Sequence, residues 1–455
     1  MKFSVINLGC KVNRVESDAA AALLLSRGGQ EAFGKEADIV VVNTCTVTGE
    51  AEKKARKAVR RALRDHPCAR IVVTGCAAAL DSAAYRALDS RVDVVAKGAI
   101  DAYLSEQASR LCESEAGREQ DASTPSDRPL PAPVGGSFRT RVGVKVQDGC
   151  DNACTFCIVH VARGQATSRS ADEVSNECAT LARSGVREIV LTGINLGSYC
   201  DGDRRDPQAV RLSDLVSRLL RETDGLGGRE DVPTRFRISS IEPRDVDERL
   251  VSLLAEGEGR LCRHLHLPLQ SGSDKVLREM ARPYDVGRYI ALVDRLREAI
   301  PTISLSTDII VGFPGETDAE FQQTLAVARH CGFSKIHVFP YSVRAGTPAA
   351  QRTDQVPMAV RAQRAAAARA LGDELRAADY ARRVGMHELV LVEAGNTAMT
   401  ESYFEIPAPR GSAPGALVDA LLPPVPDVSE GLCALSGKAE RNDGLCESAA
   451  QAATL

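Results

Sequence analysis

The chain has 455 residues, enough for two or three domains. Hydrophobic residues make up 44% of it and charged residues 26%, which are ordinary values for a soluble globular protein. The formal net charge of -4 excludes a generally basic surface, so nucleic-acid binding needs a local patch. The absence of an 18-residue apolar run and of a signal peptide predicts a cytoplasmic protein without membrane spans, whose 14 cysteines stay reduced.

Strand and helix patterns alternate in residues 1–112. Runs rich in β-branched residues at 2–8, 38–42, 70–74 and 92–95 are separated by helical stretches such as 15–26 and 51–64. This alternation predicts a small α/β domain with a parallel sheet.

One cysteine follows each of the first three predicted strands, namely Cys10, Cys45 and Cys76. Because the carboxyl ends of parallel strands share one edge of a sheet, we expect these thiols to converge there. A lone cysteine at such a position is more often a small buried apolar residue, and that alternative stays open for each of them. Three at equivalent positions favour a metal-cluster site.

The predicted helix after Cys45 is strongly basic. Lys53, Lys57, Arg60 and Arg64 fall on one of its faces, while the opposite face is apolar. A charged face of this kind is often only solvated, but its closeness to a predicted cluster edge favours contact with nucleic-acid phosphates.

Residues 113–135 are rich in Ser, Asp, Pro and Gly and have no periodicity, which predicts a linker rather than a long surface loop. In residues 136–357 six strand–helix repeats follow, with strands expected at 141–147, 188–192, 235–240, 264–269, 303–311 and 335–340. Six repeats are too few for a closed eight-stranded barrel, so we expect a partial (β/α)6 barrel of TIM type, open on one side, with its chemistry at the carboxyl ends of the strands.

Three cysteines lie within eight residues just after the first predicted barrel strand: Cys150, Cys154 and Cys157. Their spacing suits a [4Fe-4S] cluster with three protein ligands, which leaves one iron free to bind a small molecule. A zinc site needs a second ligand pair, and a disulfide framework needs an oxidising compartment; the sequence indicates neither.

This loop, with Phe156 before its last cysteine, resembles the signature of the radical S-adenosylmethionine (SAM) enzymes. In that superfamily the free iron binds SAM, and the cofactor supplies the radical chemistry. The resemblance implies a SAM pocket built from Phe156 and from residues at the other strand ends: Gly193, Asn195, Ser240, Glu242, Gln270 and Gly312. Each of these could instead serve an ordinary turn or helix cap.

The remaining residues predict a helical connector at 358–383 and a small β-rich module at 384–440, followed by a disordered tail at 441–455. The module resembles the RNA-binding TRAM domain only in degenerate form. It is acidic between residues 388 and 430, where Arg410 is the single basic residue.

Several motifs together resemble the radical SAM methylthiotransferases, over residues 1 to about 350. They are Cys10-Lys11-Val12-Asn13, Asn43-Thr44-Cys45-Thr46-Val47-Thr48, Gly75-Cys76, the loop at 150–157, Arg163-Gly164, the run His264-Leu265-His266-Leu267-Pro268-Leu269-Gln270-Ser271-Gly272, and Gly312-Phe313-Pro314-Gly315. The first two, with Gln147-Asp148-Gly149-Cys150, are closest to the branch that modifies N6-threonylcarbamoyladenosine next to the tRNA anticodon.

That resemblance implies two [4Fe-4S] clusters, an auxiliary one on Cys10, Cys45 and Cys76 and a SAM-binding one on Cys150, Cys154 and Cys157. One SAM molecule would methylate sulfur on the auxiliary cluster, and a second would yield the radical that removes hydrogen from C2 of the adenine. The implied partners are the tRNA anticodon stem-loop, a sulfide donor and a low-potential electron donor such as flavodoxin or ferredoxin, with the enzyme acting as a monomer.

Two kinds of alternative remain. The first is a sister activity on isopentenyl-adenosine in tRNA or on an aspartate of a ribosomal protein. The second, from another class, is a non-catalytic iron–sulfur sensor or electron carrier, which would not need six strand ends arranged around a free iron.

Overall fold

The computed structural model describes residues 1–32, 36–47, 49–115, 140–226, 233–257 and 259–424. Helix α5 (Ile100–Glu115) extends into the predicted linker, so its residues 113–115 are helical. The rest of that linker, residues 425–440 of the predicted C-terminal module and the predicted tail lie outside the described residues. The domain boundaries therefore stay predictions.

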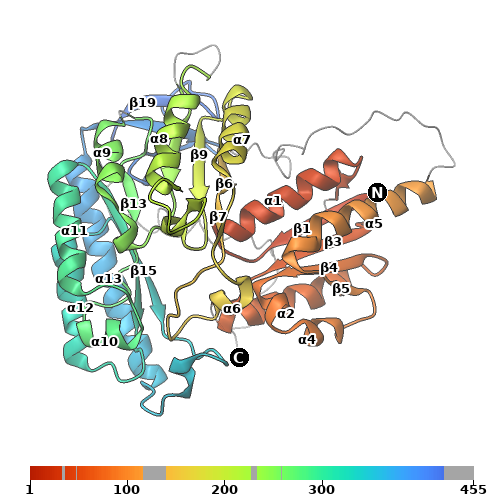
Figure 1. The fold of residues 1–455 in the computed structure, drawn as a ribbon, viewed down its shortest axis with the longest axis horizontal. Coiled ribbons are helices and arrows are strands. Elements are labelled where there is room, and N and C mark those ends of the chain that lie inside the picture. The colour runs from red at the N-terminus through yellow and green to blue at the C-terminus, as the bar shows by residue number, and fades with distance from the viewer. Residues whose placement is uncertain (33–35, 48, 116–139, 227–232, 258, 425–455) are drawn as a thin grey trace, which may run out of the picture.

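The N-terminal part is a parallel five-stranded sheet with helices on both faces (Figure 1). Its strand order is β2-β1-β3-β4-β5, from β1 (Lys2–Asn7), β2 (Gln30–Glu31), β3 (Ile39–Thr44), β4 (Arg70–Gly75) and β5 (Val92–Val94). All but the short edge strand β2 are expected from the sequence. The helices are α1 (Lys11–Ser26), α2 (Gly49–Asp65), α3 (Cys76–Leu80), α4 (Ser82–Arg86) and α5, with a 3-10 turn at Lys97–Ala99.

Alternation along β3 divides the core of this sheet into two layers. Val40 and Val42 pack with Val59 of α2, whereas Ile39 and Val41 pack with α1 and α5. Both faces of the sheet are covered, as a parallel sheet requires.

The central part is an open barrel of six parallel strands, which confirms the predicted fold class. The strands are β6 (Arg141–Lys145), β9 (Glu188–Thr192), β12 (Arg235–Ile238), β13 (His264–His266), β14 (Ser304–Val311) and β15 (Lys335–Pro340). Two ladders, β12-β9-β6 and β13-β14-β15, meet through single bridges from Phe236 to Leu261 and from Ser240 to His266. No described strand joins β6 to β15, so the barrel stays open there.

Helices surround the outside of the barrel strands (Figure 1). They are α7 (Ala171–Arg183), α8 (Leu212–Glu222), α9 (Glu248–Glu256), α10 (Asp274–Glu279), α11 (Val286–Ala299), α12 (Asp318–Cys331) and α13 (Met358–Arg383). Shorter pieces are α6 (Val159–Arg163), β7 (Gln147–Asp148), β8 (Thr167–Ser168), β10 (Cys200–Asp201), β11 (Val210–Arg211) and 3-10 turns at Leu196–Ser198, Pro243–Asp245 and Pro348–Gln351. None of the helices in the described ranges is both long and apolar enough to cross a membrane.

The C-terminal part is a four-stranded antiparallel sheet with the order β18-β17-β16-β19. It consists of β16 (His387–Glu393), β17 (Thr397–Thr400), β18 (Glu405–Pro407) and β19 (Leu417–Leu421). Within this module, the residues directly before β18 form a turn and not a strand. Tyr403 adopts a positive φ of 70°, and the Ser402 hydroxyl bonds to the Glu388 carboxylate at 2.7 Å, so a turn forms there instead.

This C-terminal sheet closes the amino-terminal end of the barrel. Arg235 and Arg237 of β12 are fully buried and share the carboxylate of Glu188, each with an N–O distance of 2.7 Å. Burial alone would raise the pKa of Glu188, but the charges of the two arginines hold it well below its usual range. Their remaining N–H groups donate to the backbone carbonyl groups of Leu389, Met399, Thr400 and Glu401.

The acidic residues of the C-terminal sheet contribute to the same junction. Glu388 pairs with Arg383 at 3.3 Å, Glu393 with Arg141 at 2.7 Å, and Glu401 with Arg263. Much of the acidity seen in the sequence is therefore used inside the protein, where it holds the sheet against the barrel.

Candidate functional site

The structure brings Cys10, Cys45 and Cys76 to one edge of the N-terminal sheet. Cys10 precedes α1, Cys45 follows β3 and Cys76 begins α3, directly after β4. Since β1, β3 and β4 are neighbours, the three residues lie at adjacent strand ends. Burial raises the pKa of the Cys45 thiol, and charge on Cys10 or Cys76 raises it further.

A polar frame holds these three loops together. The Asn13 side-chain amide donates to Asn43 Oδ1 at 2.8 Å and to the Thr44 carbonyl at 3.0 Å, and Cys10 Sγ lies 3.2 Å from Asn13 Oδ1. Gly75 has a φ of +97°, and a Cβ there would lie 2.3 Å from the Thr44 carbonyl oxygen. Only glycine permits this close approach of β3 and β4 just before Cys76.

The second cysteine set lies in a loop after β7. Gly149 starts the loop with a φ of +70°, and a Cβ on it would collide with the Gln165 carbonyl at 1.9 Å. Burial raises the pKa of Cys157 to about 11 and also raises that of Cys150, with the charges of the neighbouring thiols adding to it. These raised pKa values keep the free thiols protonated, and metal binding displaces the thiol protons. The set therefore fits cluster ligands better than it fits free thiolates.

Two buried arginines touch the two cysteine sets, one each. Arg282 donates to Cys154 Sγ at 3.2 Å and to both oxygens of Glu242 at 2.6 Å. Arg163, which ends α6, donates to Cys76 Sγ at 3.2 Å. An N–H donor on a ligand sulfur tunes a cluster and orients its ligand.

Arg163 also joins the barrel to the N-terminal domain. Its side chain is 1% exposed, and it donates to Asp148 at 2.7 Å, to Glu16 at 3.0 Å and to Asn13 at 3.1 Å. Burial would raise the pKa of Asp148, but the charges of Arg163 and Lys145 lower it to about 2. The sequence shows Arg163 only as part of a motif, because its partners lie up to 150 residues away.

The predicted SAM residues have different surroundings. Asn195 and Gly193 contact Gln147: the Asn195 N–H donates to Gln147 Oε1 at 2.9 Å, and a Cβ on Gly193 would lie 2.8 Å from the same oxygen. Ser240 is bridged to His266, and Glu242 is held by Arg282.

Gln270 and Phe156 line a cavity, whereas Gly312 packs against Arg361 of α13, outside that lining. Gln270 has a positive φ of 65°, an uncommon conformation that recurs at functional sites.

The barrel rim offers unused polar atoms to a cofactor. Asn195 Oδ1, Ser239 Oγ and Asp245 Oδ2 are buried and have no hydrogen-bond partner among the described residues. Burial raises the pKa of Asp245 to about 6. Buried polar atoms rarely stay unpaired, so these three at the ends of β9 and β12 fit a polar ligand such as SAM. Ser239 and Asp245 have no place in the sequence prediction.

A cavity of about 150 Å³ lies between the two cysteine sets. Cys157 lines it from the barrel, and Thr46 and Val47, which follow Cys45, line it from the N-terminal domain. Its other walls come from Phe156, Ile158, Val159, Gln270, Asp308, Ile310, Phe339, Pro340, Tyr341, Ser342 and Arg344. Arg344 also binds Thr46 and pairs with Glu52 at 3.3 Å, which fixes the N-terminal wall of the cavity.

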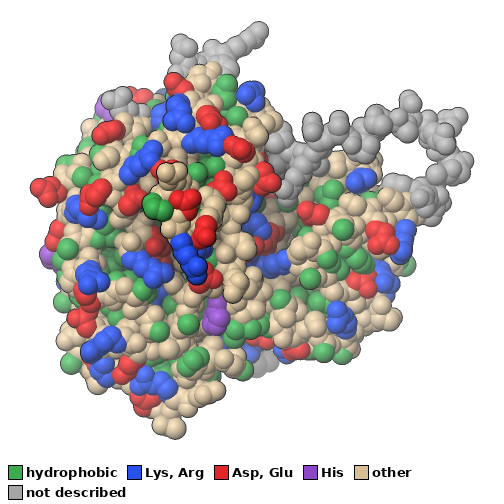
Figure 2. Space-filling model, viewed as in Figure 1, with side chains coloured by type: hydrophobic (Ala, Val, Ile, Leu, Met, Phe, Trp, Pro, Cys, Tyr) green, Lys and Arg blue, Asp and Glu red, His purple; other side chains and the backbone are tan. Residues whose placement is uncertain are grey.

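The basic helix is α2, on the face of the N-terminal sheet that Figure 1 shows below it. Lys53, Lys57, Arg60 and Arg64 are exposed. Arg64 pairs with Asp65 at 3.3 Å, whereas the other three have no ion-pair partner among the described residues. Figure 2 shows basic and acidic side chains mixed over the face in view. Three of the four cations on this face, Lys53, Lys57 and Arg60, therefore carry positive charge that no described acidic side chain neutralises.

Comparison with known proteins identifies two regions of the chain. Residues 144–328 match the Radical SAM superfamily, and residues 2–97 match the Uncharacterized protein family UPF0004. In fold, the chain resembles the radical S-adenosylmethionine methyltransferase TsrM from Kitasatospora setae, with a TM-score of 0.51 and 16% identity over 77% of this chain and 75% of that one.

Curated relatives match nearly the whole chain. The Threonylcarbamoyladenosine tRNA methylthiotransferase MtaB of Bacillus subtilis is 38% identical, over 87% of this chain and 86% of the relative. The tRNA-2-methylthio-N(6)-dimethylallyladenosine synthase of the same organism is 35% identical, over 86% of this chain and 76% of the relative. The chain therefore belongs to the radical SAM methylthiotransferase family, enzymes that use SAM and [4Fe-4S] clusters to transfer a sulfur-containing group.

Proposed function

We propose that this enzyme methylthiolates C2 of N6-threonylcarbamoyladenosine next to the anticodon of tRNA. The observation that carries the proposal is the cavity that Cys157 and the Thr46–Val47 segment after Cys45 share. A methylthiotransferase must bring sulfur delivery and hydrogen removal to one substrate atom, which a cavity between two cysteine sets allows. The relatives named for threonylcarbamoyladenosine support the choice of nucleoside.

In this proposal Cys10, Cys45 and Cys76 hold one [4Fe-4S] cluster, and Cys150, Cys154 and Cys157 hold the other. When bound, the clusters and SAM would supply the sulfur, the methyl group and the radical. A sulfide donor and a low-potential electron donor such as flavodoxin or ferredoxin complete the requirements.

The chain's own residues then prepare the site. Arg163 and Arg282 each place an N–H on a ligand sulfur. Phe156, Ile310 and Phe339 give the cavity apolar walls, which keep water away from reactive species.

Nucleoside analysis of tRNA tests the proposal. A strain that lacks this gene should lose 2-methylthio-N6-threonylcarbamoyladenosine and accumulate its precursor, and the wild-type gene should restore the product. Loss of the 2-methylthio derivative of isopentenyl-adenosine instead would identify the sister activity. A mass change confined to a ribosomal protein would identify the aspartate activity.

The α2 face should bind tRNA phosphates. We expect the combined change of Lys57, Arg60 and Arg64 to Ala to weaken tRNA binding, because a complex with fewer phosphate contacts releases fewer counterions when it forms. The slope of log affinity against log salt should flatten by about one unit per lost contact.

The matched control for this experiment is Arg288→Ala, which removes a 79%-exposed arginine from α11 on the outside of the barrel. It should leave the slope as it is. If the α2 triple variant keeps the wild-type slope and full modification activity, the face is only solvated.

A further inference from the structure

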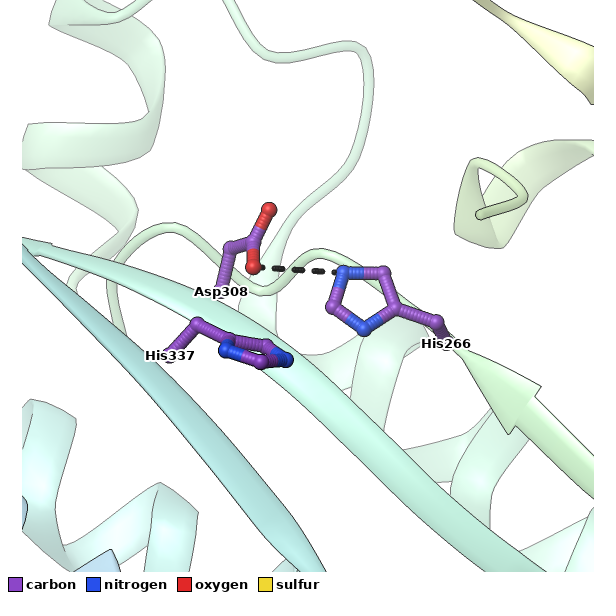
Figure 3. A group of neighbouring side chains, drawn as sticks. All are labelled: His266, Asp308 and His337. Carbon is purple, nitrogen blue, oxygen red and sulfur yellow. Dashed lines mark ion pairs between the residues drawn. The ribbon is translucent and has the colours of Figure 1, made fainter. Parts of the chain in front are cut away.

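Three adjacent barrel strands bring polar side chains close to one another (Figure 3). Asp308 of β14 is paired in register with His337 of β15, and His266 comes from β13. His266 Nε2 lies 3.2 Å from Asp308 Oδ1, and the two histidine rings are 5.6 Å apart at their centroids. We call these three residues the His–Asp–His group.

The group lies one step deeper in the barrel than the cavity between the cysteine sets. Side chains two residues apart on a strand point to the same face. Ile310 and Phe339, two residues beyond Asp308 and His337, line the cavity, and Asp308 itself belongs to its wall. A substituent of a base held in that cavity therefore meets the His–Asp–His group first when it points into the barrel.

Part of the hydrogen-bonding capacity of the group is already used. His266 is fixed on both sides, because Ser306 Oγ lies 3.0 Å from its Nδ1 and Asp308 from its Nε2. Asp308 Oδ2 and both ring nitrogens of His337 have no hydrogen-bond partner among the described residues.

The free atoms of the group include both donors and acceptors. Desolvation lowers the pKa of His337 to about 4, and the charges of His266, Lys335 and Lys11 lower it while Asp308 opposes them. A neutral imidazole offers one N–H donor and one acceptor nitrogen. Lys11 and Lys335 act on His337 as nearby positive charges, which suits a carboxylate.

A threonylcarbamoyl substituent has what these atoms need: urea N–H groups, a carbonyl, a hydroxyl and a carboxylate. A dimethylallyl substituent has none of them and would leave Asp308 Oδ2 and the ring nitrogens of His337 without a substrate partner. Sites built to hydrogen-bond a substrate group reject an analogue that lacks it far more strongly than apolar pockets reject an added polar group.

We propose that the His–Asp–His group is the subsite that binds the polar N6 substituent and selects it against an apolar one. This inference rests on the proposed function, since it names the part of the same site that recognises the nucleoside. Within the group, His337 would make most of the hydrogen bonds to the substituent, because neither nitrogen of its ring has a partner among the described residues.

The test uses the reconstituted holoenzyme and three synthetic anticodon stem-loops. They differ only at the modified position, which is N6-threonylcarbamoyladenosine, unmodified adenosine or N6-dimethylallyladenosine. Binding is measured by fluorescence anisotropy, and methylthiolation by mass analysis. The variants are His337→Phe, which keeps the aromatic volume, and Asp308→Asn, with His330→Phe on the outer helix α12 as the matched control.

We expect His337→Phe to reduce the affinity ratio of the threonylcarbamoyl stem-loop over the unmodified one by roughly tenfold, the size of one lost hydrogen bond. Its preference should move toward the dimethylallyl stem-loop, whereas His330→Phe keeps the wild-type ratio. Iron content and circular dichroism check that each variant is folded and loaded.

The outcomes separate the two proposals. If the wild-type enzyme modifies the threonylcarbamoyl stem-loop but His337→Phe and Asp308→Asn keep its affinity ratio, the subsite is refuted and the proposed function stands. A wild-type enzyme that modifies only the dimethylallyl stem-loop refutes both. A stoichiometric metal other than iron that is lost in His337→Phe would assign the group to a metal ion and would also refute the subsite.

Discussion

Replacing Cys150, Cys154 and Cys157 together by Ala is expected to abolish reductive cleavage of SAM. Anaerobic reconstitution of the wild-type enzyme should give about eight irons per chain, one cubane for each cysteine set, and the triple variant about four. Four other barrel cysteines, Cys178, Cys200, Cys262 and Cys331, are buried and therefore poorly placed to replace the lost ligands. Iron analysis and the yield of 5'-deoxyadenosine are the measurements.

Cys68→Ala is the control for this variant, since Cys68 is an exposed cysteine outside both sets. It should keep all of the iron. An unchanged iron content in the triple variant would show that the loop after β7 holds no cluster.

The converse change of Cys10, Cys45 and Cys76 to Ala should stop methylthio transfer to tRNA while SAM cleavage continues. The reason is the division seen in the structure: this set lies on the N-terminal sheet, whereas the buried polar atoms that fit SAM lie at the ends of β9 and β12. The measurements are 5'-deoxyadenosine formation and the content of methylthiolated nucleoside. Continued transfer by this variant would reduce the N-terminal set to a structural role.

The two triple variants control each other. Each should lose about half of the iron, and only the change in the loop at 150–157 should remove SAM cleavage. Loss of SAM cleavage in both would mean that the N-terminal set also supports the SAM site, through Arg163 or the shared cavity wall.

The sequence predicts the fold well where local patterns are strong. Helix α13 begins and ends as expected, because Pro357 precedes it and the helix itself is rich in alanine. Runs of valine identify β3 and β4, and with them the neighbouring strand ends that carry Cys45 and Cys76. Strand β13 is shorter than predicted and ends before Pro268, which cannot donate to a strand ladder.

Features that depend on distant residues could not be predicted. Arg282 and Cys154 are 128 residues apart, and Arg163 and Cys76 are 87 apart, so no local pattern shows their contacts. The pairing of Asp308 with His337 depends on the register of β14 and β15. From the sequence alone, the acidic C-terminal residues suggest a charged surface. In the structure, three of them bind arginines of the barrel or of helix α13.

Arg163 ties the two cysteine-bearing domains together through its buried guanidinium. Its guanidinium completes the hydrogen bonding of Asn13 and Glu16 on one domain and of Asp148 on the other. Separating the domains would break the hydrogen bonds from Arg163 to Glu16, Asn13 and Cys76, whereas its bond to Asp148 lies within the barrel part. The contacts at this junction, rather than the length of chain that connects α5 to β6, therefore set the spacing between the two cysteine sets.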